Sequence, residues 1–529
     1  MRLLRLLFTL SVALVAAAAA GAGPDRAESR LRFEVSLRPG LVPSPQDGRL
    51  LVLLGRKGDP EPRQQVGIPD REDPVILGRD VRGLVPGRPA EVDGRAAIYP
   101  LISLAGLPPG DYFVQAVLAV NRDLRGINRP GDLFGAPVRM HLDPARRARI
   151  LLELSEKEPP DAPPPDGEFV RYMRIESRLL SEFHHRPIFL RAGVILPRDH
   201  GKDPARRFPL RVHIGGYGAR YTNVANWMEP GSDFRRAWES EGAPPMIVLH
   251  LDGAGPFGDP YQVDSANNGP YGEAVTRELI PAVEEKFRGL GTPLSRFLDG
   301  GSTGGWVSLA LQMFYPDFFN GTWSSCPDGV DFRGFQLLDI YNDENAYVNA
   351  FGNERPGGRD VNGDVLFTMR RELQIENVLG NGDRWTLSGG QWGAWNAAYG
   401  PRGADRLPAP LWDPRTGTID HRIAETWKRY DLRLVLQQGW PVLAPKLRGK
   451  IHVWVGEADT FFLNNAVHLL EDFLATARPP FDGTIVYGPR QEHCWFPLSQ
   501  RELMDQMAAP AFRPGANPVD GDLRKPARP

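Results

Sequence analysis

Apolar and polar residues alternate along the first 155 residues in short runs, which glycine- and proline-rich turns separate. In "LRFEVSL" (31–37) every second position is apolar, as in a strand with one buried face. No helical period appears before residue 155, and three further runs favour strands: "RLLVLLG", "GDYFVQAVLAV" and "ARILLELS". We therefore expect a small antiparallel β-sandwich over residues 24–155.

A proline-rich segment, "EKEPPDAPPPDGE" (156–168), follows these strands. It holds five prolines between residues 159 and 165 and no large apolar residue, so it cannot contribute to a core. Such composition is typical of a stiff, extended linker. The sequence therefore predicts a domain boundary here.

From residue 169 onward, strand-like and helix-like runs alternate. The run "PMIVLHLD" (245–252) is almost continuously apolar, which suits a strand buried on both faces of a parallel sheet. In "YGEAVTRELIPAVEEKF" (271–287) apolar residues recur every four positions, as in a helix, and Pro281 is expected to kink it. This alternation predicts a doubly wound α/β domain over residues 169–515.

The stretch between Cys326 and Lys450 interrupts the alternation. It is long, irregular and rich in glycine, tryptophan and asparagine. We interpret residues 327–450, approximately, as an insertion that covers the active site as a lid.

The N-terminal "MRLLRLLFTLSVALVAAAAAGAG" has two arginines, an apolar stretch and small residues, in that order. This is the form of a secretory signal peptide, here residues 1–22 with cleavage between about Ala18 and Ala22; a transmembrane anchor is the alternative. We expect the mature protein to be secreted or periplasmic, without a membrane span. The formal net charge of −2 excludes nucleic acid as an expected partner.

"GGSTG" (300–304) matches G-x-S-x-G and lies between an apolar run and an apolar helix. In a nucleophile elbow the chain turns sharply from strand to helix, and glycines on either side let the serine expose its hydroxyl. Ser302 is then the nucleophile, and the Thr303 backbone N–H donates to the oxyanion. A flexible glycine loop is the alternative.

A serine nucleophile needs a base, and in α/β-hydrolases the acid and then the histidine follow the serine in the chain. Of the four histidines after Ser302, His493 lies directly after the last predicted strand, "GTIVYG". The preceding strand ends in "VGEAD", where Asp459 is the expected acid and Glu457 the alternative. The predicted triad is Ser302, Asp459 and His493.

The second oxyanion donor should come from a loop after an earlier strand. "HIGGYG" fits, with the Tyr217 N–H as the expected donor and that of Gly216 as the alternative. This chemistry requires no cofactor, and no metal site is expected.

From about residue 170 to 510 the chain resembles the "putative esterase" family of α/β-hydrolases. The matching stretches are "HIGGYG", "NNGPYGEAVTRELIPAVEEKF", "GGSTGGWVSLALQMFYPDFFNGTWSSC", "VGEADTFFLNNA" and "EHCW". The family includes feruloyl and acetyl xylan esterases, enterochelin esterase-like enzymes, S-formylglutathione hydrolases and mycolyltransferases. The resemblance implies the same triad and places residues 268–271, beginning with Asn268, near the active site. The long insertion and the sandwich domain depart from the family pattern, so substrate specificity does not carry over.

Cys326 ends the strand after the elbow and Cys494 adjoins the predicted base. A disulfide between them would clamp the His493 loop, and two free thiols are the alternative. Trp306, beside the elbow, is expected in the core or in the pocket wall.

The sequence thus predicts an exported serine hydrolase that cleaves small-molecule or polysaccharide-linked carboxylic esters through an acyl-enzyme. Two alternatives remain open. One is an acyltransferase that uses the same triad, and the other is a non-catalytic binding or adhesion protein with a hydrolase fold.

Overall fold

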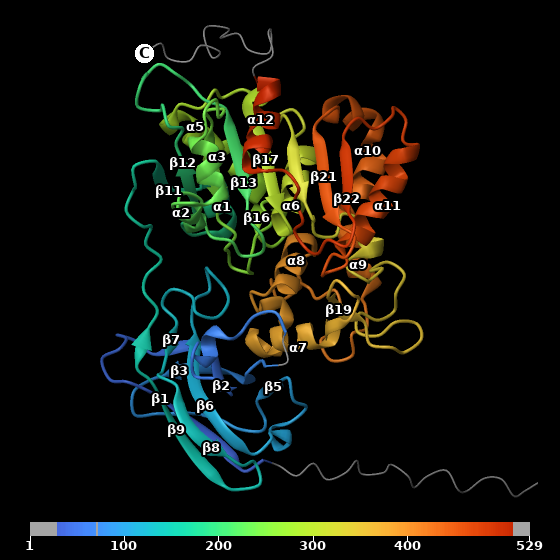
Figure 1. Ribbon diagram of the computed structural model, residues 1–529. Coiled ribbons are helices and arrows are strands. Elements are labelled where there is room, and N and C mark those ends of the chain that lie inside the picture. The colour runs from blue at the N-terminus through green and yellow to red at the C-terminus, as the bar shows by residue number, and fades with distance from the viewer. Residues whose placement is uncertain (1–28, 70–71, 512–529) are drawn as a thin grey trace, which may run out of the picture.

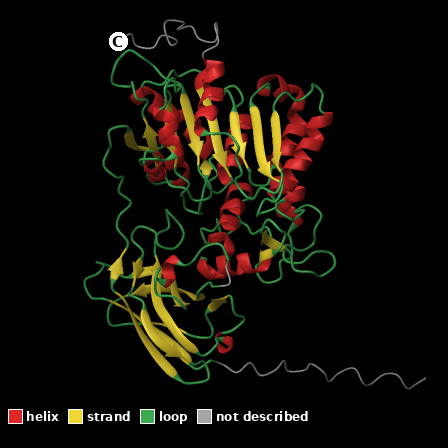
Figure 2. Ribbon diagram, viewed as in Figure 1, coloured by secondary structure: helices red, strands yellow, loops and turns green. Residues whose placement is uncertain are grey.

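The computed structural model describes residues 29–69 and 72–511. An all-β part comes first and an α/β part follows it, with helices on the faces of the second part's central sheet (Figures 1 and 2). The predicted signal peptide lies outside the described residues. Among the helices of this described part, none has the length and the apolar composition needed to cross a bilayer.

Two sheets form the all-β part. The smaller has the order β4-β1-β9, and the larger has the order β10-β7-β6-β2-β3-β5, with β8 also paired to β6. Their bounds are β1 Leu31–Leu37, β2 Gln46–Gly55, β3 Val75–Leu84, β4 Ala90–Val92, β5 Ala97–Tyr99, β6 Gly110–Ala119, β7 Leu133–Phe134, β8 Val138–Leu142, β9 Ala148–Leu154 and β10 Glu156–Lys157. The apolar positions of β1 all point into the core between the two sheets, as their alternation predicted.

Strand β2 is buried on both faces. Leu50 and Val52 face the core between the sheets, whereas Leu51 and Leu53 pack against Ile375 and Val378 of the second part. The unbroken apolar run of β2 therefore packs in two interfaces, one between the two sheets and one with the second part of the chain. The two parts of the chain share an apolar cluster and are not merely joined by a linker.

The proline-rich segment is held in place. Strand β10 lies at its start, within the stretch predicted as linker. Beyond it, Asp161 forms ion pairs with Arg191 at 3.0 Å and with Arg220 at 3.1 Å. These contacts tie the segment to the sheet of the α/β part.

That sheet has eight strands in the order β11-β12-β14-β13-β17-β18-β21-β22. The strands from β14 to β22 are parallel, and β11 and β12 are antiparallel to their neighbours. Their bounds are β11 Val170–Glu176, β12 Phe189–Ile195, β13 Leu210–Ile214, β14 Ile247–Leu251, β17 Arg296–Gly301, β18 Thr322–Ser325, β21 Ile451–Gly456 and β22 Thr484–Gly488. The predicted class, a doubly wound α/β-hydrolase domain preceded by an all-β sandwich, is confirmed. The sandwich is not wholly antiparallel as expected, because β1 and β9 pair in parallel.

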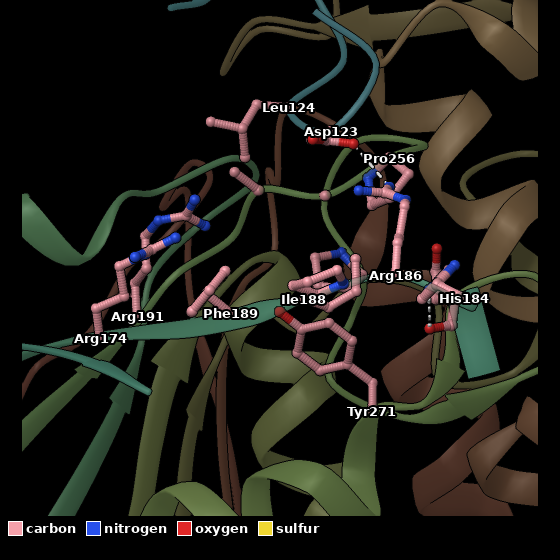
Figure 3. Close-up of a pocket in the computed structure, with 15 residues that line it drawn as sticks. Asp123, Leu124, Arg174, His184, Arg186, Ile188, Phe189, Arg191, Pro256 and Tyr271 are labelled. Carbon is pink, nitrogen blue, oxygen red and sulfur yellow. Dashed lines mark hydrogen bonds and ion pairs between the residues drawn. The ribbon is translucent and has the colours of Figure 1, made fainter. Parts of the chain in front are cut away.

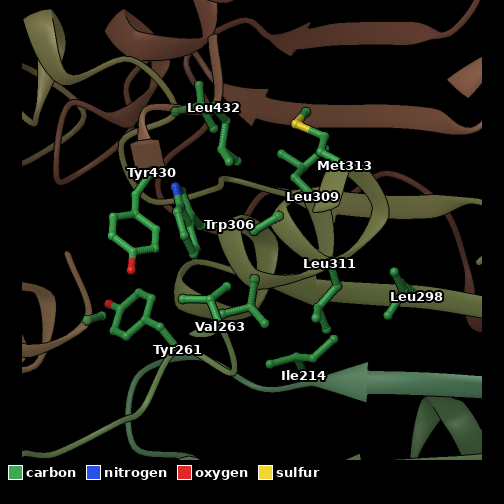
Figure 4. Packing of buried hydrophobic residues seen from close by; sticks show 14 of the residues in the cluster. Ile214, Tyr261, Val263, Leu298, Trp306, Leu309, Leu311, Met313, Tyr430 and Leu432 are labelled. Atoms are coloured by element: carbon green, nitrogen blue, oxygen red, sulfur yellow. The ribbon is translucent and has the colours of Figure 1, made fainter. Parts of the chain in front are cut away.

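Helices cover both faces of this sheet. Helices α3 and α12 pack on one face around Phe297 and Trp323, and α5, α6, α10 and α11 pack on the other. Figure 4 shows this second core, where α6 side chains meet those of β13 and β17. The bounds outside the insertion are α1 Arg178–His184, α2 Val224–Trp227, α3 Asp233–Glu239, α4 Tyr271–Ala274, α5 Ile280–Phe287, α6 Thr303–Phe314, α11 Leu463–Thr476 and α12 Gln500–Ala511.

The predicted effect of Pro281 is seen as a local widening of the helix. Helix α4 continues into α5 through one π-helical stretch, Val275–Leu279. Proline has no N–H to donate and its ring collides with the carbonyl one turn earlier, and a π turn accommodates both. The helix is therefore continuous from Tyr271 to Phe287.

Residues 327–450 carry two short strands and four helices, and most of them lie between the large sheet and the sandwich (Figure 1). Their bounds are β19 Pro356–Arg359, β20 Val365–Thr368, α7 Met369–Leu379, α8 Gln391–Tyr399, α9 His421–Trp427 and α10 Leu432–Leu447. The short strands β15 (Asp264–Ser265) and β16 (Gly269–Pro270) pair near α8. Helix α7 covers the sandwich, and α8 approaches the end of β17.

Candidate active site

Ser302 lies in a sharp turn between β17 and α6. Its φ is +57° and its ψ is −123°, a conformation that costs energy for any residue with a side chain. Glycine is required on both sides of Ser302 because the Ile214 carbonyl oxygen lies very close to the backbone there. A Cβ on Gly300 would lie 2.5 Å from this oxygen, and a Cβ on Gly304 would lie 1.9 Å from it. The local geometry is that of a nucleophile elbow, with the half-buried serine at the N-terminus of a twelve-residue helix.

Asp459 and His493 come from the ends of the next two strands. The His493 Nδ1 lies 2.9 Å from the Asp459 Oδ2. The Asp459 carboxylate is fully buried, and its Oδ1 accepts from the backbone N–H of Phe461 at 2.9 Å and of Leu463 at 3.2 Å. Glu457, the alternative acid, instead contacts His468 at 3.3 Å. The geometry therefore favours Asp459 over Glu457.

Two sulfur atoms connect His493 to the elbow. The Ser302 N–H donates to the Cys326 Sγ at 3.3 Å, and the Cys494 Sγ lies 2.7 Å from the Cys326 Sγ. A ring nitrogen of His493 lies within 4.8 Å of both sulfurs. The sulfur pair thus links the His493 loop to the elbow, and no hydrogen bond joins the side chains of His493 and Ser302 among the described contacts.

The electrostatics of His493 depend on its two neighbours. Burial alone would lower its pKa, but hydrogen bonds to Asp459 and Cys494, and the negative charge of both groups, raise the pKa to about 10. The hydrogen bond from Cys326 lowers the pKa of Cys494 to about 6, burial opposes this shift, and His493 adds to it. With free thiols, the pair is therefore a thiolate beside an imidazolium near neutral pH.

Backbone N–H groups converge on Ser302 from two sides. Gly216 approaches closely, since a Cβ placed on it would lie 3.9 Å from the Ser302 Cβ. The Tyr217 ring is fixed by a hydrogen bond from its hydroxyl to the Gly389 carbonyl. In the described hydrogen bonds the N–H groups of Tyr217 and Thr303 have no acceptor, so both remain available to a ligand oxygen.

Asp328 is a buried carboxyl group that the sequence analysis missed. Its Oδ1 lies 3.3 Å from the Ser302 Oγ, and its Oδ2 accepts from the Tyr261 hydroxyl at 2.8 Å and the Thr303 Oγ1 at 3.0 Å. Asp328 follows β18, which is the neighbour of β17 in the sheet. Because the carboxyl ends of parallel strands meet at one edge, this position was the signal that could have identified it.

Two side chains of α8 reach the same carboxyl group. The Trp395 Nε1 donates to the Asp328 Oδ2 at 3.1 Å, and the Gln391 Nε2 donates to it at 3.3 Å. Both residues lie in the insertion, where no sequence pattern distinguished a residue of the site from one that packs in the core. The sequence analysis therefore did not predict them. The insertion thus contacts Asp328, the carboxyl group that lies next to Ser302.

A family model described as "Putative esterase" matches residues 190–482, more than half of the chain. The chain belongs to this esterase family. As a member, it is a carboxylic ester hydrolase. No curated protein sequence matches the esterase significantly.

Several solved structures of esterases and serine hydrolases are similar to the esterase at low identity. A ferulic acid esterase is 13% identical, with 64% of this chain and 94% of that chain covered and a TM-score of 0.35. An S-formylglutathione hydrolase from Agrobacterium tumefaciens is 13% identical, with 64% and 92% covered and a TM-score of 0.37. A fluorophosphonate-binding serine hydrolase of Staphylococcus aureus is 12% identical, with 64% and 96% covered and a TM-score of 0.38.

Two predicted pocket residues of the esterase lie elsewhere. Trp306 is fully buried in the core, where its ring packs against Tyr261 and Tyr399, so the core and not the pocket wall is the correct one of the two predicted places. It projects from the side of α6 that faces the core. Asn268 lies in a cavity at the junction of the two parts, and its backbone carbonyl contacts the His184 ring at 3.2 Å.

This cavity has a volume of about 190 Å³ and is separate from the triad (Figure 3). Arg174 and Arg191 of the sheet edge line one side of it, and Arg186 forms an ion pair with Asp123 of the sandwich at 2.7 Å. Its lining includes neither Ser302 nor His493. The cavity therefore belongs to the junction between the parts and not to the reacting groups.

The part of the chain that the structure describes contains one set of three candidate metal ligands: Cys326, His493 and Cys494. Two thiolates on one tetrahedral zinc ion, each about 2.3 Å from the metal, would lie about 3.8 Å apart. The observed sulfur separation of 2.7 Å is much shorter. Both cysteines are free in the structure, and their sulfur atoms lie too close together to be two ligands of one zinc ion.

Proposed function

We propose that the protein is an exported serine esterase that cleaves carboxylic esters through an acyl-enzyme on Ser302. The observation that carries this proposal is the 2.9 Å contact between the His493 Nδ1 and the buried Asp459, beside a serine held in the elbow conformation. A base oriented by a buried carboxylate next to a strained serine is the arrangement that acyl transfer needs.

In the proposed reaction, His493 takes the proton of Ser302 as the Oγ attacks the ester carbonyl. This step requires a rotation of the Ser302 side chain from Asp328 towards the imidazole. The Thr303 and Tyr217 N–H groups donate to the tetrahedral oxyanion, with the N-terminus of α6 behind them. Protonated His493 then gives its proton to the leaving alcohol. In the second half of the reaction His493 takes a proton from water as the water attacks the acyl-enzyme, and it returns this proton to the Ser302 Oγ as the acid leaves.

The proposed location is secreted or periplasmic, because the N-terminal pattern is that of a signal peptide. The proposed substrates are small-molecule or polysaccharide-linked esters, by the resemblance to feruloyl and acetyl xylan esterases. Acyl transfer to an alcohol remains the second candidate, since the same acyl-enzyme can react with either acceptor. Added alcohol would divert product from acid to new ester only in that case.

Labelling with a fluorophosphonate probe tests the proposal. We expect the purified protein to be labelled at Ser302, as mapped by mass spectrometry, and to hydrolyse acetyl and feruloyl esters. Ser302→Ala should lose both. Ser308→Ala is the matched control, because Ser308 lies in the same helix and bonds only its own helix through Gly305. A folded protein that is neither labelled nor active would favour a binding or adhesion role.

A further inference from the structure

Arg174 lines the cavity at the junction of the two parts, and its positive charge is uncompensated. The residue lies in β11, directly opposite Arg191 of β12 in the antiparallel pairing, where like charges repel each other. The charge of Arg191 is balanced, since Asp161 lies 3.0 Å and Asp252 lies 3.7 Å from its guanidinium. Among the described residues, no carboxylate forms an ion pair with Arg174. This wall of the cavity therefore holds a free cation.

An aromatic ring fixes the Arg174 guanidinium at this wall. The guanidinium stacks over Phe189, with 3.4 Å between its central carbon and the ring centroid, and Phe189 also lines the cavity (Figure 3). A planar guanidinium that lies on a ring keeps the N–H groups along its edge free, and these match the two oxygens of a carboxylate. Arg174 is thus already arranged to pair with an anion.

Two uncharged donors in the lining are also without an acceptor. Asn268 is 3% exposed, and its Nδ2 is buried with no hydrogen-bond partner among the described residues. The Tyr271 hydroxyl, drawn in Figure 3, has no partner in the described hydrogen bonds. A buried donor without an acceptor costs free energy, which an acceptor bound in the cavity would offset.

The acceptors of the lining are engaged with other groups. Arg125 of the sandwich donates to the Gly255 carbonyl at 3.1 Å through its backbone N–H and to the Pro256 carbonyl at 2.8 Å through its guanidinium. The Asp123 carboxylate is paired with Arg186. Because the free groups are donors and one positive charge is unpaired, the cavity suits an anion and not a cation.

The size and the apolar part of the lining restrict the anion further. A volume of about 190 Å³ is below the range of about 300–1,000 Å³ that is usual for drug-sized ligands. Apolar side chains form the rest of the wall, so part of the ligand is an organic body: Leu124, Pro187, Ile188, Phe189, Pro256 and Pro260. A single ring that carries a carboxylate meets both conditions.

We propose that this cavity binds a small organic carboxylate, either an aromatic acid or a sugar acid, and that Arg174 pairs with its charge. The site is separate from Ser302 and goes beyond the proposed ester hydrolysis. Two sources share this chemistry. One is the acid that ester cleavage releases, and the other is a uronic acid of a polysaccharide.

Isothermal titration calorimetry of the wild-type protein with 4-hydroxycinnamate and with D-glucuronate tests the proposal. We expect at least one of these acids to bind with a Kd of about 0.1–1 mM, as befits so small a ligand. Its uncharged counterpart, 4-hydroxycinnamyl alcohol or D-glucose, should bind at least about tenfold more weakly, because it cannot pair with the guanidinium. Binding of the aromatic acid alone indicates the released product, and binding of the sugar acid alone indicates the polysaccharide.

Variants of Arg174 assign the binding to this cavity. Arg174→Ala should weaken it at least about tenfold, since the charge-assisted hydrogen bonds are lost. Arg174→Lys should weaken it less, because it keeps the charge but not the two parallel N–H groups. Arg178→Ala is the matched control: Arg178 is exposed, pairs with Glu182 at 3.0 Å and does not line the cavity.

Three results would overturn the proposal: no binding of either acid, equal binding of the uncharged counterparts, or unchanged binding in a folded Arg174→Ala protein. Urea melts establish that the variants are folded. Fluorophosphonate labelling of Ser302 is measured without these ligands. Failure of the carboxylate site and failure of the proposed function are therefore distinguishable.

Discussion

The sulfur atoms of Cys326 and Cys494 lie 2.7 Å apart, directly behind the elbow that carries Ser302. Both cysteines have positive φ angles, 39° for Cys326 and 61° for Cys494. With Ser302, three strained residues meet at one point, as is typical of functional sites. A covalent bond between the sulfurs, about 2.05 Å long, would require only a small approach.

The first prediction is that reduction of this pair lowers the activity. In the dithiol form, hydrogen bonds to Asp459 and Cys494 and the charges of these groups raise the pKa of His493, so less of the imidazole is free to accept a proton near neutral pH. A disulfide removes the Cys494 thiolate and lowers that pKa, so the base becomes available at lower pH. We expect dithiothreitol to reduce ester hydrolysis about ten- to hundredfold at pH 8, reversibly on reoxidation with oxidised glutathione.

The control for this prediction is the double variant Cys326→Ser/Cys494→Ser, which should not respond to reductant. Alkylation with iodoacetamide before reduction reports the state of the thiols. Full alkylation of both residues in an unreduced, fully active protein would rule out the clamp.

A second prediction concerns the acid of the triad. Asp459→Asn should keep the fold but lower kcat by about 10³- to 10⁴-fold, because an amide at this place no longer holds the imidazole tautomer or stabilises the imidazolium. Glu457→Gln is the matched control, since Glu457 contacts His468 and not His493. Equal losses in the two variants would contradict the assignment of Asp459.

Much of this architecture follows from patterns along the chain. Strand β1 alternates because one face is buried, and β14 is continuously apolar because both faces are. Strand β2 shows the limit of this inference. Its apolar run predicted a strand, but only the folded structure reveals that α7, more than 300 residues later, covers its second face through Ile375 and Val378.

The residues of the candidate site likewise fall into two groups, those that the sequence predicted and those that it did not. Glycine spacing and strand ends predicted Ser302, Asp459 and His493, because local backbone geometry fixes them. Asp328 was missed although its place after β18 was a usable signal, whereas the contacts of Gln391 and Trp395 depend on how the insertion folds back onto α6. Contacts between segments that are distant in sequence leave no local pattern.

A third prediction concerns the sandwich, which braces the loops around Tyr217. The Arg125 guanidinium donates to the Pro256 carbonyl at 2.8 Å and to the Leu387 carbonyl at 3.2 Å. Gly389, which accepts from the Tyr217 hydroxyl, follows two residues after Leu387. Arg125→Ala should therefore lower kcat/KM about tenfold by loosening an oxyanion donor, a loss of the size expected from small misplacements.

The exposed neighbour Arg122 provides the comparison for that variant. Arg122→Ala should leave kcat/KM unchanged, and urea melts should show both variants folded. An Arg125→Ala protein with wild-type kinetics would mean that the sandwich does not support the site.

The last prediction concerns Asp299, three residues before Ser302. The Arg211 guanidinium, fully buried, donates twice to its carboxylate at 2.8 Å, and the His213 Nδ1 lies 2.9 Å from it. Burial alone would raise the pKa of Asp299, but the charges of Arg211 and His213 hold it well below its usual range. Asp299→Asn leaves the buried guanidinium unpaired, so we expect a loss of about 3–5 kcal/mol in the free energy of unfolding at pH 7.

The pH dependence of that loss follows from the sign of the shift. Because the pKa of Asp299 is lower in the folded state, its stabilisation is complete above the unfolded value of about 3.9 and is lost as the pH falls below it. Urea melts of the wild type and the variant should therefore converge at acidic pH. Asp482→Asn, which breaks an exposed pair with Arg448, should cost little at any pH. A constant gap between wild type and Asp299→Asn from pH 7 to pH 3 would show that packing, and not charge, makes Asp299 important to the elbow strand.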